Sequence, residues 1–383
     1  MIYIYKIPSK NSIDDTNSRV SVFLKNKNYI SEEDIFLVAR NNKVILELVP
    51  GYLFKDQLTT DVFIDDNFYK KYKSMLTHKN IYLVFSFVRE MSPHTQFLIP
   101  ILKTIEKYPE LCKKIIYFSV YDVKEEVSNL CKLLNITGKQ IFNIVYEHFE
   151  LEANHKYFVE NCYKKYNPDV IHNKNKLFVS VNCKPEKFNR LNLALLLYKH
   201  NLLNDGIFKL NNHSSNNYLK YVHKELLKEY AKYSINWNDR SEIETVNING
   251  THTGYPYPVE FYNSTYISLV SETHFDDHRV FHTEKTYRTI ANEHPFIYLG
   301  PYNSLKDLHK KGYKTFSPFI DETYDTITDH FNRLNIAIKN LKEKQRIVDN
   351  YQHIREISKY NVEILRNRST QQIETIEKIL FSL

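Results

Sequence analysis

The sequence predicts an α/β protein with two parallel-sheet domains that face a shared cleft, followed by C-terminal helices. Three observations carry this prediction. At 383 residues the chain is longer than one hydrophobic core usually supports. Short apolar runs alternate with helical segments in two successive stretches, which indicates parallel strands joined by helices. The pattern then becomes wholly helical. The predicted domains are residues 1–168, 169–324 and 325–383.

In the first domain, short apolar runs with many β-branched and aromatic residues are predicted to be strands. They cover residues 34–38, 43–49, 80–88, 113–120 and 140–145. Helical spacing appears between them, at residues 100–108 and 124–134. We expect this domain to end near residue 168.

The second domain repeats the alternation. Strands are predicted at residues 176–181, 206–210, 266–270 and 295–299. The helix expected at 188–199 has an apolar stripe made of Leu191, Ala194, Leu195 and Tyr198. Residues 211–262 are polar and irregular, with one amphipathic helix at 218–233. From residue 325 onward, apolar residues recur at helical spacing, which predicts helices that pack back on the domains.

Composition is that of an ordinary soluble protein, with 42% hydrophobic and 25% charged residues. We expect no signal peptide and no membrane span, because no stretch of about 18 apolar residues occurs. The four scattered cysteines lack zinc-site spacing, so a reducing cytoplasm is expected. The net charge of +7 is spread along the chain and suits a phosphate-bearing ligand as well as DNA. The oligomeric state is left open.

Polar and cationic residues follow the strand at 176–181 and run into the next helix. Asn182, Lys187 and Arg190 lie in this junction. A helix N-terminus offers free N–H groups and a positive dipole end, so the junction can hold a diphosphate. A solvated polar loop explains the same residues equally well. No Gly-x-Gly-x-x-Gly pattern is present, which disfavours dinucleotide binding of the dehydrogenase type.

A second polar group follows the strand at 266–270. It comprises Glu272 and, on a helix expected to start near Thr283, the residues Glu284, Lys285 and Arg288. A carboxylate can accept ribose hydroxyls while the two cations neutralise a diphosphate. By spacing alone, a Glu284–Arg288 surface pair at i and i+4 is the commoner explanation.

Several motifs together resemble a known family. In chain order they are FVSVNC at 178–183, NR at 189–190, YISLVSE at 266–272, TEKTYR at 283–288, HPFIYLG at 294–300 and GYKTF at 312–316. This series resembles the donor domain of fucosyltransferase-type GT-B glycosyltransferases. It is more similar still to the glycosyltransferase-like proteins of bacteriophages and large DNA viruses. The resemblance covers roughly residues 176–335.

The resemblance implies a GT-B fold, with two Rossmann-like domains and a nucleotide-sugar donor bound by the second one. It implies that Arg190 and Lys285 bind the donor diphosphate and that Glu284 holds the ribose. Glu272 takes the place of an acidic residue that precedes Asn in the fucosyltransferases, whereas Thr273 stands here instead of that Asn. GDP-fucose therefore does not follow as the donor.

The acceptor half of the reaction needs a general base from the first domain. Glu90, with His94 in the same loop, is the preferred choice. Asp122 and the pair Glu147 and His148 also follow predicted strands, and each of these groups is more commonly a helix cap or a surface group. No cofactor and no metal site are expected. The nearest metal candidate, Asp276-Asp277, is better explained as a solvated loop.

The sequence thus predicts an inverting, metal-independent glycosyltransferase in a cytoplasm, that of the host cell if the chain is viral. The acceptor is expected to be a glycan or a modified base in viral DNA. The alternative is a non-catalytic, virion-associated protein that binds a nucleotide sugar or glycan and keeps a degenerate transferase fold.

Overall fold

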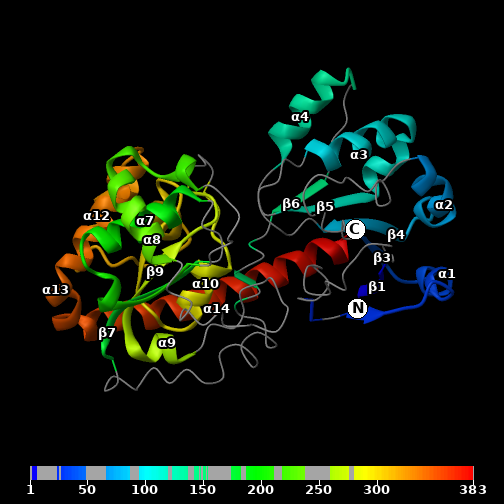
Figure 1. Ribbon diagram of the computed structural model, residues 1–383. Coiled ribbons are helices and arrows are strands. Elements are labelled where there is room, and N and C mark those ends of the chain that lie inside the picture. The colour runs from blue at the N-terminus through cyan, green and yellow to red at the C-terminus, as the bar shows by residue number, and fades with distance from the viewer. Residues whose placement is uncertain are drawn as a thin grey trace. The chain divides into compact units, whose positions relative to one another are not determined.

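The computed structural model describes most of the chain, and its residues fall into two compact units. Unit 1 comprises Met1–Leu151 and Thr370–Leu383, and unit 2 comprises Glu152–Ser369. The described residues are 2–6, 24–25, 27–48, 66–86, 95–119, 123–136, 142–145, 147, 150–151, 153, 174–182, 187–210, 218–237, 259–275 and 280–382. Each unit is described by itself below (Figure 1).

Unit 1 is built on a sheet in which every described pairing is parallel, with the strand order β2-β1-β3-β4-β5-β6. The strands are β1 Ile2–Lys6, β2 Lys27–Tyr29, β3 Val44–Leu48, β4 Ile81–Ser86, β5 Ile115–Ser119 and β6 Phe142–Val145. The central strands are apolar on both sides, as expected when both faces of a parallel sheet are covered.

Helices cover one face of this sheet and the end of a long C-terminal helix covers the other. The helices of unit 1 are α1 Ile35–Ala39, α2 Asp66–Leu76, α3 Thr95–Lys107, the 3₁₀ helix η4 Pro109–Lys113 and α4 Lys124–Leu133. The alternate side chains of β4 divide between two cores: Leu83 joins the one under these helices, and Val84 joins the other. The second core also holds Ile376 and Leu380 from α14 Tyr351–Ser382, whose end lies across the sheet from α2 and α3 in Figure 1.

Two sequence expectations for unit 1 need correction. Residues 34–38, expected to be a strand, lie in and around α1, because Ile35 and Ala39 are spaced by four and are both buried on one helix face. The strands β1 and β2 and the helix α2 were not anticipated. The other predicted strands and helices are present, with ends shifted by a few residues.

Unit 2 contains a four-stranded parallel sheet with the order β10-β9-β7-β8. The strands are β7 Lys176–Asn182, β8 Gly206–Leu210, β9 Thr265–Ser271 and β10 Phe296–Leu299. The α-helices are α7 Phe188–Lys199, α8 Leu227–Trp237, α9 Val259–Ser264, α10 Glu284–Ala291, α11 Ser304–Lys310, α12 His330–Lys342, α13 Lys344–Asp349 and α14. Short 3₁₀ helices are η5 Leu203–Asp205, η6 Leu219–Tyr221, η7 Lys224–Leu226 and η8 Thr323–Thr326.

Helix α7 is buried on every side, so its predicted apolar stripe was too narrow. All residues from Asn189 to Leu197 are buried, whereas Tyr198 is only half-buried. Both α8 and α12 pack on this helix. The amphipathic helix predicted at 218–233 is instead two 3₁₀ turns followed by α8, which begins at Leu227.

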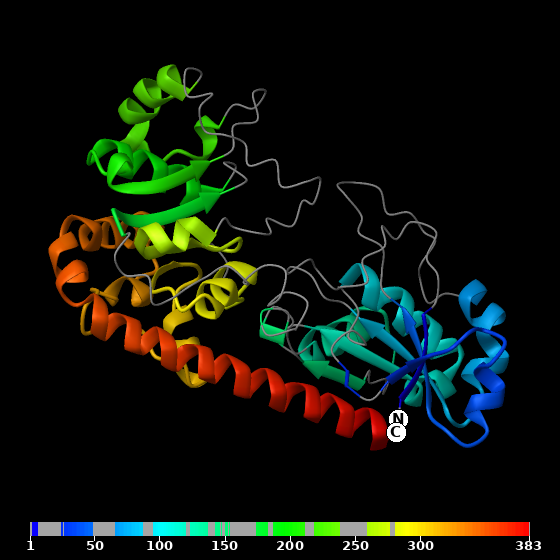
Figure 2. The same cartoon turned by 90° about the horizontal axis from the view of Figure 1, so that it is seen from below.

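The expected α/β fold class with two parallel Rossmann-like sheets is confirmed. The division of the chain differs from the predicted boundaries at 168 and 324, because residues 325–369 belong to unit 2 and residues 370–383 to unit 1. Figure 2 shows α14 as one continuous helix that supplies residues to both. Among the helices that the structure describes, none is both long and apolar enough to cross a membrane.

Candidate functional site

The polar residues of unit 2 gather at the C-terminal edge of its sheet, where the strand order reverses. From β7 the chain passes through α7 to β8, and from β9 it passes through α10 to β10 on the other side. Because such crossovers are right-handed, α7 and α10 lie on opposite faces of the sheet. The crevice that opens at this point is the usual ligand position in parallel α/β sheets.

The junction between β7 and α7 supplies the first group of predicted residues. Asn182 ends β7 and is buried, with its Nδ2 donating to Ser180 Oγ at 3.1 Å. Lys187 is the half-buried N-cap of α7, with an extended backbone. Arg190 lies in the first turn of α7 and is only 3% exposed. Two cations therefore lie at the positive end of this helix.

Asn189 links the residues at the start of α7 to those that follow β9, and the sequence analysis did not predict this role. Its Nδ2 donates to the backbone oxygen of Glu272 at 3.0 Å, which ties the first turn of α7 to the end of β9. Its Oδ1 and the Oγ of Ser271 are buried and have no hydrogen-bond partner among the described residues. Such buried polar atoms are the groups that a polar ligand can satisfy. The only signal in the sequence was a polar residue in the first turn of an apolar helix.

Glu272 is fully buried and binds α10 directly. Its Oε1 accepts from the backbone N–H of Thr283 at 3.0 Å and from the hydroxyl of Thr286 at 2.5 Å. Its Oε2 accepts from the hydroxyl of Thr283 at 2.5 Å. Three charge-assisted hydrogen bonds thus join the end of β9 to the first turn of α10.

Helix α10 begins as predicted, with Thr283 as its N-cap. The Nζ of Lys285 donates to the hydroxyl oxygens of Thr273, at 3.1 Å, and Thr283, at 3.2 Å, and to the carboxylate of Glu284, at 2.8 Å. Thr273, the residue that departs from the fucosyltransferase pattern, is thus a neighbour of the central cation of the site.

Glu284 and Lys285 are the more accessible members of the α10 group. Their side chains are 21% and 19% exposed, whereas Arg288 is 4% exposed. Burial opposes ionisation of Glu284, but the charge and hydrogen bond of Lys285, together with Arg288, outweigh it and lower the pKa of Glu284 to about 2. The carboxylate is therefore ionised at neutral pH and can accept hydroxyl groups.

A buried histidine stands behind α10, and sequence reasoning gave it no role. His282 is 1% exposed; its Nδ1 lies 3.1 Å from the hydroxyl of Tyr298 and its Nε2 lies 3.0 Å from Asp307 Oδ2. Burial works against the charge of Asp307, but His282 and Lys311 lower the pKa of its carboxyl well below the usual range. These contacts fix the chain just before the N-cap of α10.

Aromatic rings border the site on the α7 side. The ring of Phe188, at the start of α7, has its centroid 6.0 Å from that of His330 and 6.4 Å from that of Phe275. Phe188 and His330 are half-buried, while Phe275 is buried beneath the guanidinium of Arg333. Half-buried rings of this kind offer a surface on which a planar base can stack.

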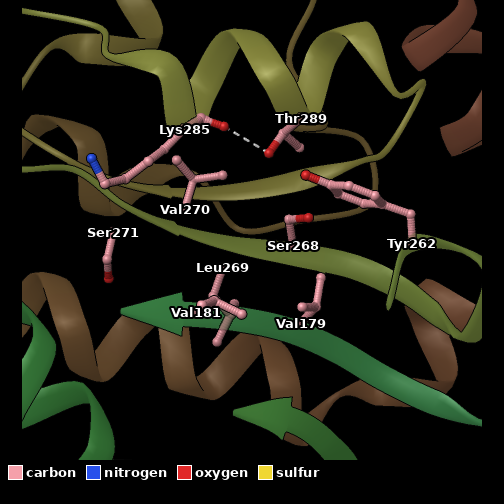
Figure 3. Close-up of a pocket in the computed structure, with 9 residues that line it drawn as sticks. All are labelled: Val179, Val181, Tyr262, Ser268, Leu269, Val270, Ser271, Lys285 and Thr289. Carbon is pink, nitrogen blue, oxygen red and sulfur yellow. Dashed lines mark hydrogen bonds between the residues drawn. The ribbon is translucent and has the colours of Figure 1, made fainter. Parts of the chain in front are cut away.

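A small cavity lies between α10 and the sheet. Figure 3 shows Lys285 and Thr289 above it, with Val179, Val181 and the residues of β9 below, and the hydroxyl of Thr289 bonded to the backbone oxygen of Lys285 at 2.8 Å. The cavity is far too small for a nucleotide sugar. It therefore marks loose packing under α10 and not the ligand position itself.

The three predicted catalytic residues of the first domain, Glu90, His94 and Asp122, lie outside the described residues, as do His148 and the Asp276-Asp277 pair. Glu147 is described, and its backbone N–H donates to Gln372 of α14 at 2.9 Å. Within the described part of the chain, no group of three or more His, Cys, Asp or Glu side chains is placed to hold a metal ion.

The predicted donor residues thus come together at one edge of one sheet. Four cations, Lys187, Arg190, Lys285 and Arg288, accompany the two carboxylates Glu272 and Glu284. The N-terminus of α7 has no side-chain cap and adds free N–H groups and the positive end of its dipole, whereas at the start of α10 the N–H groups of Thr283 and Lys285 already bind Glu272 and Thr283. This edge is electropositive, carries one accessible carboxylate and is suited to a ligand with both phosphate and hydroxyl groups.

Comparisons with known proteins found likeness only at the level of structure. No protein-family model matches the sequence, and no curated protein is significantly similar to it. An α,α-trehalose-phosphate synthase (UDP-forming) from Burkholderia vietnamiensis is 13% identical, with a TM-score of 0.42, over 92% of this chain and 78% of that one. The synthase from Burkholderia xenovorans, in complex with glucose-6-phosphate, is 11% identical, with a TM-score of 0.43, over 91% and 75%. The N-terminal domain of a trehalose-6-phosphate phosphatase from Candida albicans is 12% identical, with a TM-score of 0.42, over 98% and 96%.

Proposed function

We propose that this protein is a glycosyltransferase that moves a sugar from a nucleotide-diphosphate donor to an acceptor hydroxyl, with inversion and without a metal. The observation that carries this proposal is the electropositive edge of unit 2, where the first turn of α7 and the start of α10 are both hydrogen-bonded to Glu272 at the reversal of strand order. A diphosphate fits this edge because N–H groups, dipole ends and cations converge there.

Each part of the donor has a chemically suited partner. The diphosphate lies against the first turns of both helices, where Lys285 is an accessible cation and Arg190 adds a buried positive charge. Glu284 accepts the ribose hydroxyls, and the base stacks on Phe188 and His330. During transfer, the cations stabilise the negative charge that develops on the departing nucleotide diphosphate.

The acceptor half of the proposal rests on sequence alone. Glu90, with His94 beside it, or else Asp122, serves as the general base that removes the proton from the acceptor hydroxyl. The acceptor is a glycan or a hydroxylated base in viral DNA, and the net charge of +7 permits the second choice.

The proposal is tested by mass spectrometry of products after incubation with a mixed nucleotide-sugar pool and candidate glycan and DNA acceptors. We expect one acceptor to gain the mass of one sugar. Lys285→Ala should reduce the rate about 100-fold, since it removes a cation from the developing charge. Lys344→Ala is the matched control, because Lys344 is 57% exposed on α13 and pairs with Asp205.

Two outcomes would contradict the proposal. Calorimetry that shows nucleotide-sugar binding with no transfer to any acceptor would favour the non-catalytic binding protein. Transfer that is unchanged in Lys285→Ala would place the donor elsewhere. If DNA is the acceptor, its binding should weaken steeply with salt, and salt-insensitive binding would exclude it.

A further inference from the structure

We infer that Glu272 is a positioning residue, which acts on the donor through Thr283 and Lys285 without contacting the donor itself. For the identity of the ligand this inference rests on the proposed function. Glu272 is 0% exposed, although the sequence had placed it among the donor-binding residues.

The carboxylate of Glu272 is already engaged within the protein. It accepts one hydrogen bond on Oε2 and two on Oε1, all from Thr283 and Thr286. A carboxylate that binds a ribose needs oxygens directed at the crevice, and this one has its oxygens directed into the start of α10. Glu284, one residue into the helix, remains accessible for that role.

The link to Lys285 follows from the single proton of the Thr283 hydroxyl. That proton is donated to Glu272 Oε2 at 2.5 Å, so the lone pairs of the hydroxyl oxygen remain for Lys285. The oxygen accepts from the backbone N–H of Lys285 at 3.3 Å and from its Nζ at 3.2 Å. The carboxylate of Glu272 therefore fixes the direction of the Thr283 hydroxyl, and this hydroxyl holds the ammonium group of Lys285 together with Glu284 and Thr273.

A purely structural role for Glu272 predicts something different. If its bonds served only to begin α10, their loss would lower stability and would affect ligand binding equally whether or not Lys285 is present. If Glu272 acts through Lys285, the loss of affinity should vanish once the lysine is gone. A double-mutant cycle separates the two cases.

The experiment measures binding of inorganic pyrophosphate by calorimetry to the full chain and to Thr283→Val, Lys285→Ala and the double variant. Thr283→Val should weaken binding about tenfold, because a hydrogen bond to a charged group is lost. It should have no further effect in the Lys285→Ala background. Thr283→Ser should restore wild-type affinity. Thr289→Val is the matched control, since this hydroxyl lies on the same helix and donates to the backbone oxygen of Lys285 at 2.8 Å.

Equal losses in both backgrounds, or full affinity in Thr283→Val, would overturn the inference. If Thr283→Val does not fold, Glu272→Gln takes its place: its amide can donate to the Thr283 oxygen and compete with Lys285, so the same pattern is expected. Should the wild type bind no pyrophosphate, the proposed function fails and the environment of the Lys285 ammonium group decides on the inference. The side-chain NMR resonance of Lys285 should change in Thr283→Val and not in Thr289→Val, and an unchanged resonance would refute the inference.

Discussion

One of the buried histidines of unit 2, His294, makes the stability of this unit depend on acid pH. His294 is fully buried, with Nδ1 2.8 Å from Ser268 Oγ and Nε2 3.0 Å from the backbone oxygen of Thr265. The carbonyl requires a donor, so Nε2 carries the proton and Nδ1 accepts from the serine. Burial, with a smaller contribution from the charge of Lys174, lowers the pKa of His294 to about 3.

Acid should therefore destabilise unit 2 through this residue. Above about pH 6.5 the ring is neutral in both states. Below that pH the unfolded chain binds a proton that the folded chain does not, down to about pH 3, so stability falls as pH falls by up to about 1.4 kcal/mol per pH unit. Glu322, also in unit 2, acts in the opposite sense, because burial raises its pKa to about 7. The slope is therefore measured as the difference between wild type and His294→Gln in urea unfolding between pH 4 and 8, followed by the fluorescence of Trp237, the single tryptophan, which lies in α8 of unit 2.

His294→Gln supplies the control for that slope. The glutamine amide has a donor and an acceptor but does not titrate in this range. The variant should have a lower free energy of unfolding at pH 7. Between pH 4 and 6.5, the slope of its unfolding free energy against pH should be smaller than that of the wild type by the contribution of about one proton. Identical slopes in the two proteins would show that other groups cause the acid sensitivity.

At this scale, residue type and order predicted which residues gather at this edge of the sheet better than they predicted which side chains are accessible. Lys285 and Glu284 were expected at the crevice and are accessible, and Thr283 caps α10. Glu272 and Arg288 are buried instead. Spacing along a helix shows which residues share a face, but whether that face meets solvent depends on the sheet and loops around it, which local sequence does not specify.

At the scale of elements, one arginine of α12 holds two loops that follow strands. Arg333 is 2% exposed; its guanidinium donates to the backbone oxygens of Phe275 and Gly300 and lies 4.3 Å from the centroid of the Phe275 ring. Phe275 follows β9 and Gly300 follows β10. The arginine thus fixes the C-terminal edge of the sheet from the α12 side.

Arg333→Lys should lower the free energy of unfolding of unit 2 by about 2–4 kcal/mol. A lysine cannot reach two carbonyls and stack on a ring at the same time, and it leaves buried acceptors unsatisfied. Denaturant unfolding followed by Trp237 fluorescence measures the change. Arg346→Lys, at a guanidinium 46% exposed on α13, should change stability by less than about 0.5 kcal/mol. Equal effects of both substitutions would contradict this role.

The elements of unit 2 followed the sequence more closely than those of unit 1. Helix α7 and strand β8 have the predicted bounds. Residues 35–39 form a helix, because a five-residue apolar run fits either period and tertiary burial of Ile35 and Ala39 decided between them. The strand β2, only three residues long, has too little pattern to recognise.

At the scale of the whole molecule, unit 1 depends on the last turns of the chain. Ile376 and Leu380 of α14 pack in its second core with Val84 and Phe118, and the backbone N–H of Lys25 donates to Glu377 at 2.6 Å. No composition shift marks residue 370, so no local pattern indicates that one helix serves two units.

Ile376→Asp should therefore open unit 1 and leave unit 2 folded. Ile376 is 2% exposed, and a carboxylate placed there would be buried without a partner at a cost of more than about 3 kcal/mol. Limited proteolysis should cleave the variant within residues 1–151 faster than it cleaves the wild type. The denaturant concentration at which Trp237 fluorescence reports the unfolding of unit 2 should not change. Thr375→Asp, at the exposed neighbouring position, should resemble wild type. Equal cleavage of both variants would show that α14 does not complete this core.

The path of α14 also sets the order in which the protein can be completed during synthesis. The contact between Lys25 and Glu377 spans 352 positions, so the second core of unit 1 lacks Ile376 and Leu380 until almost all of the described chain has been synthesised. Unit 2 has its own strands and helices earlier, within residues 152–369. Of the two units, the one whose strands are translated first is thus the one whose core is completed last.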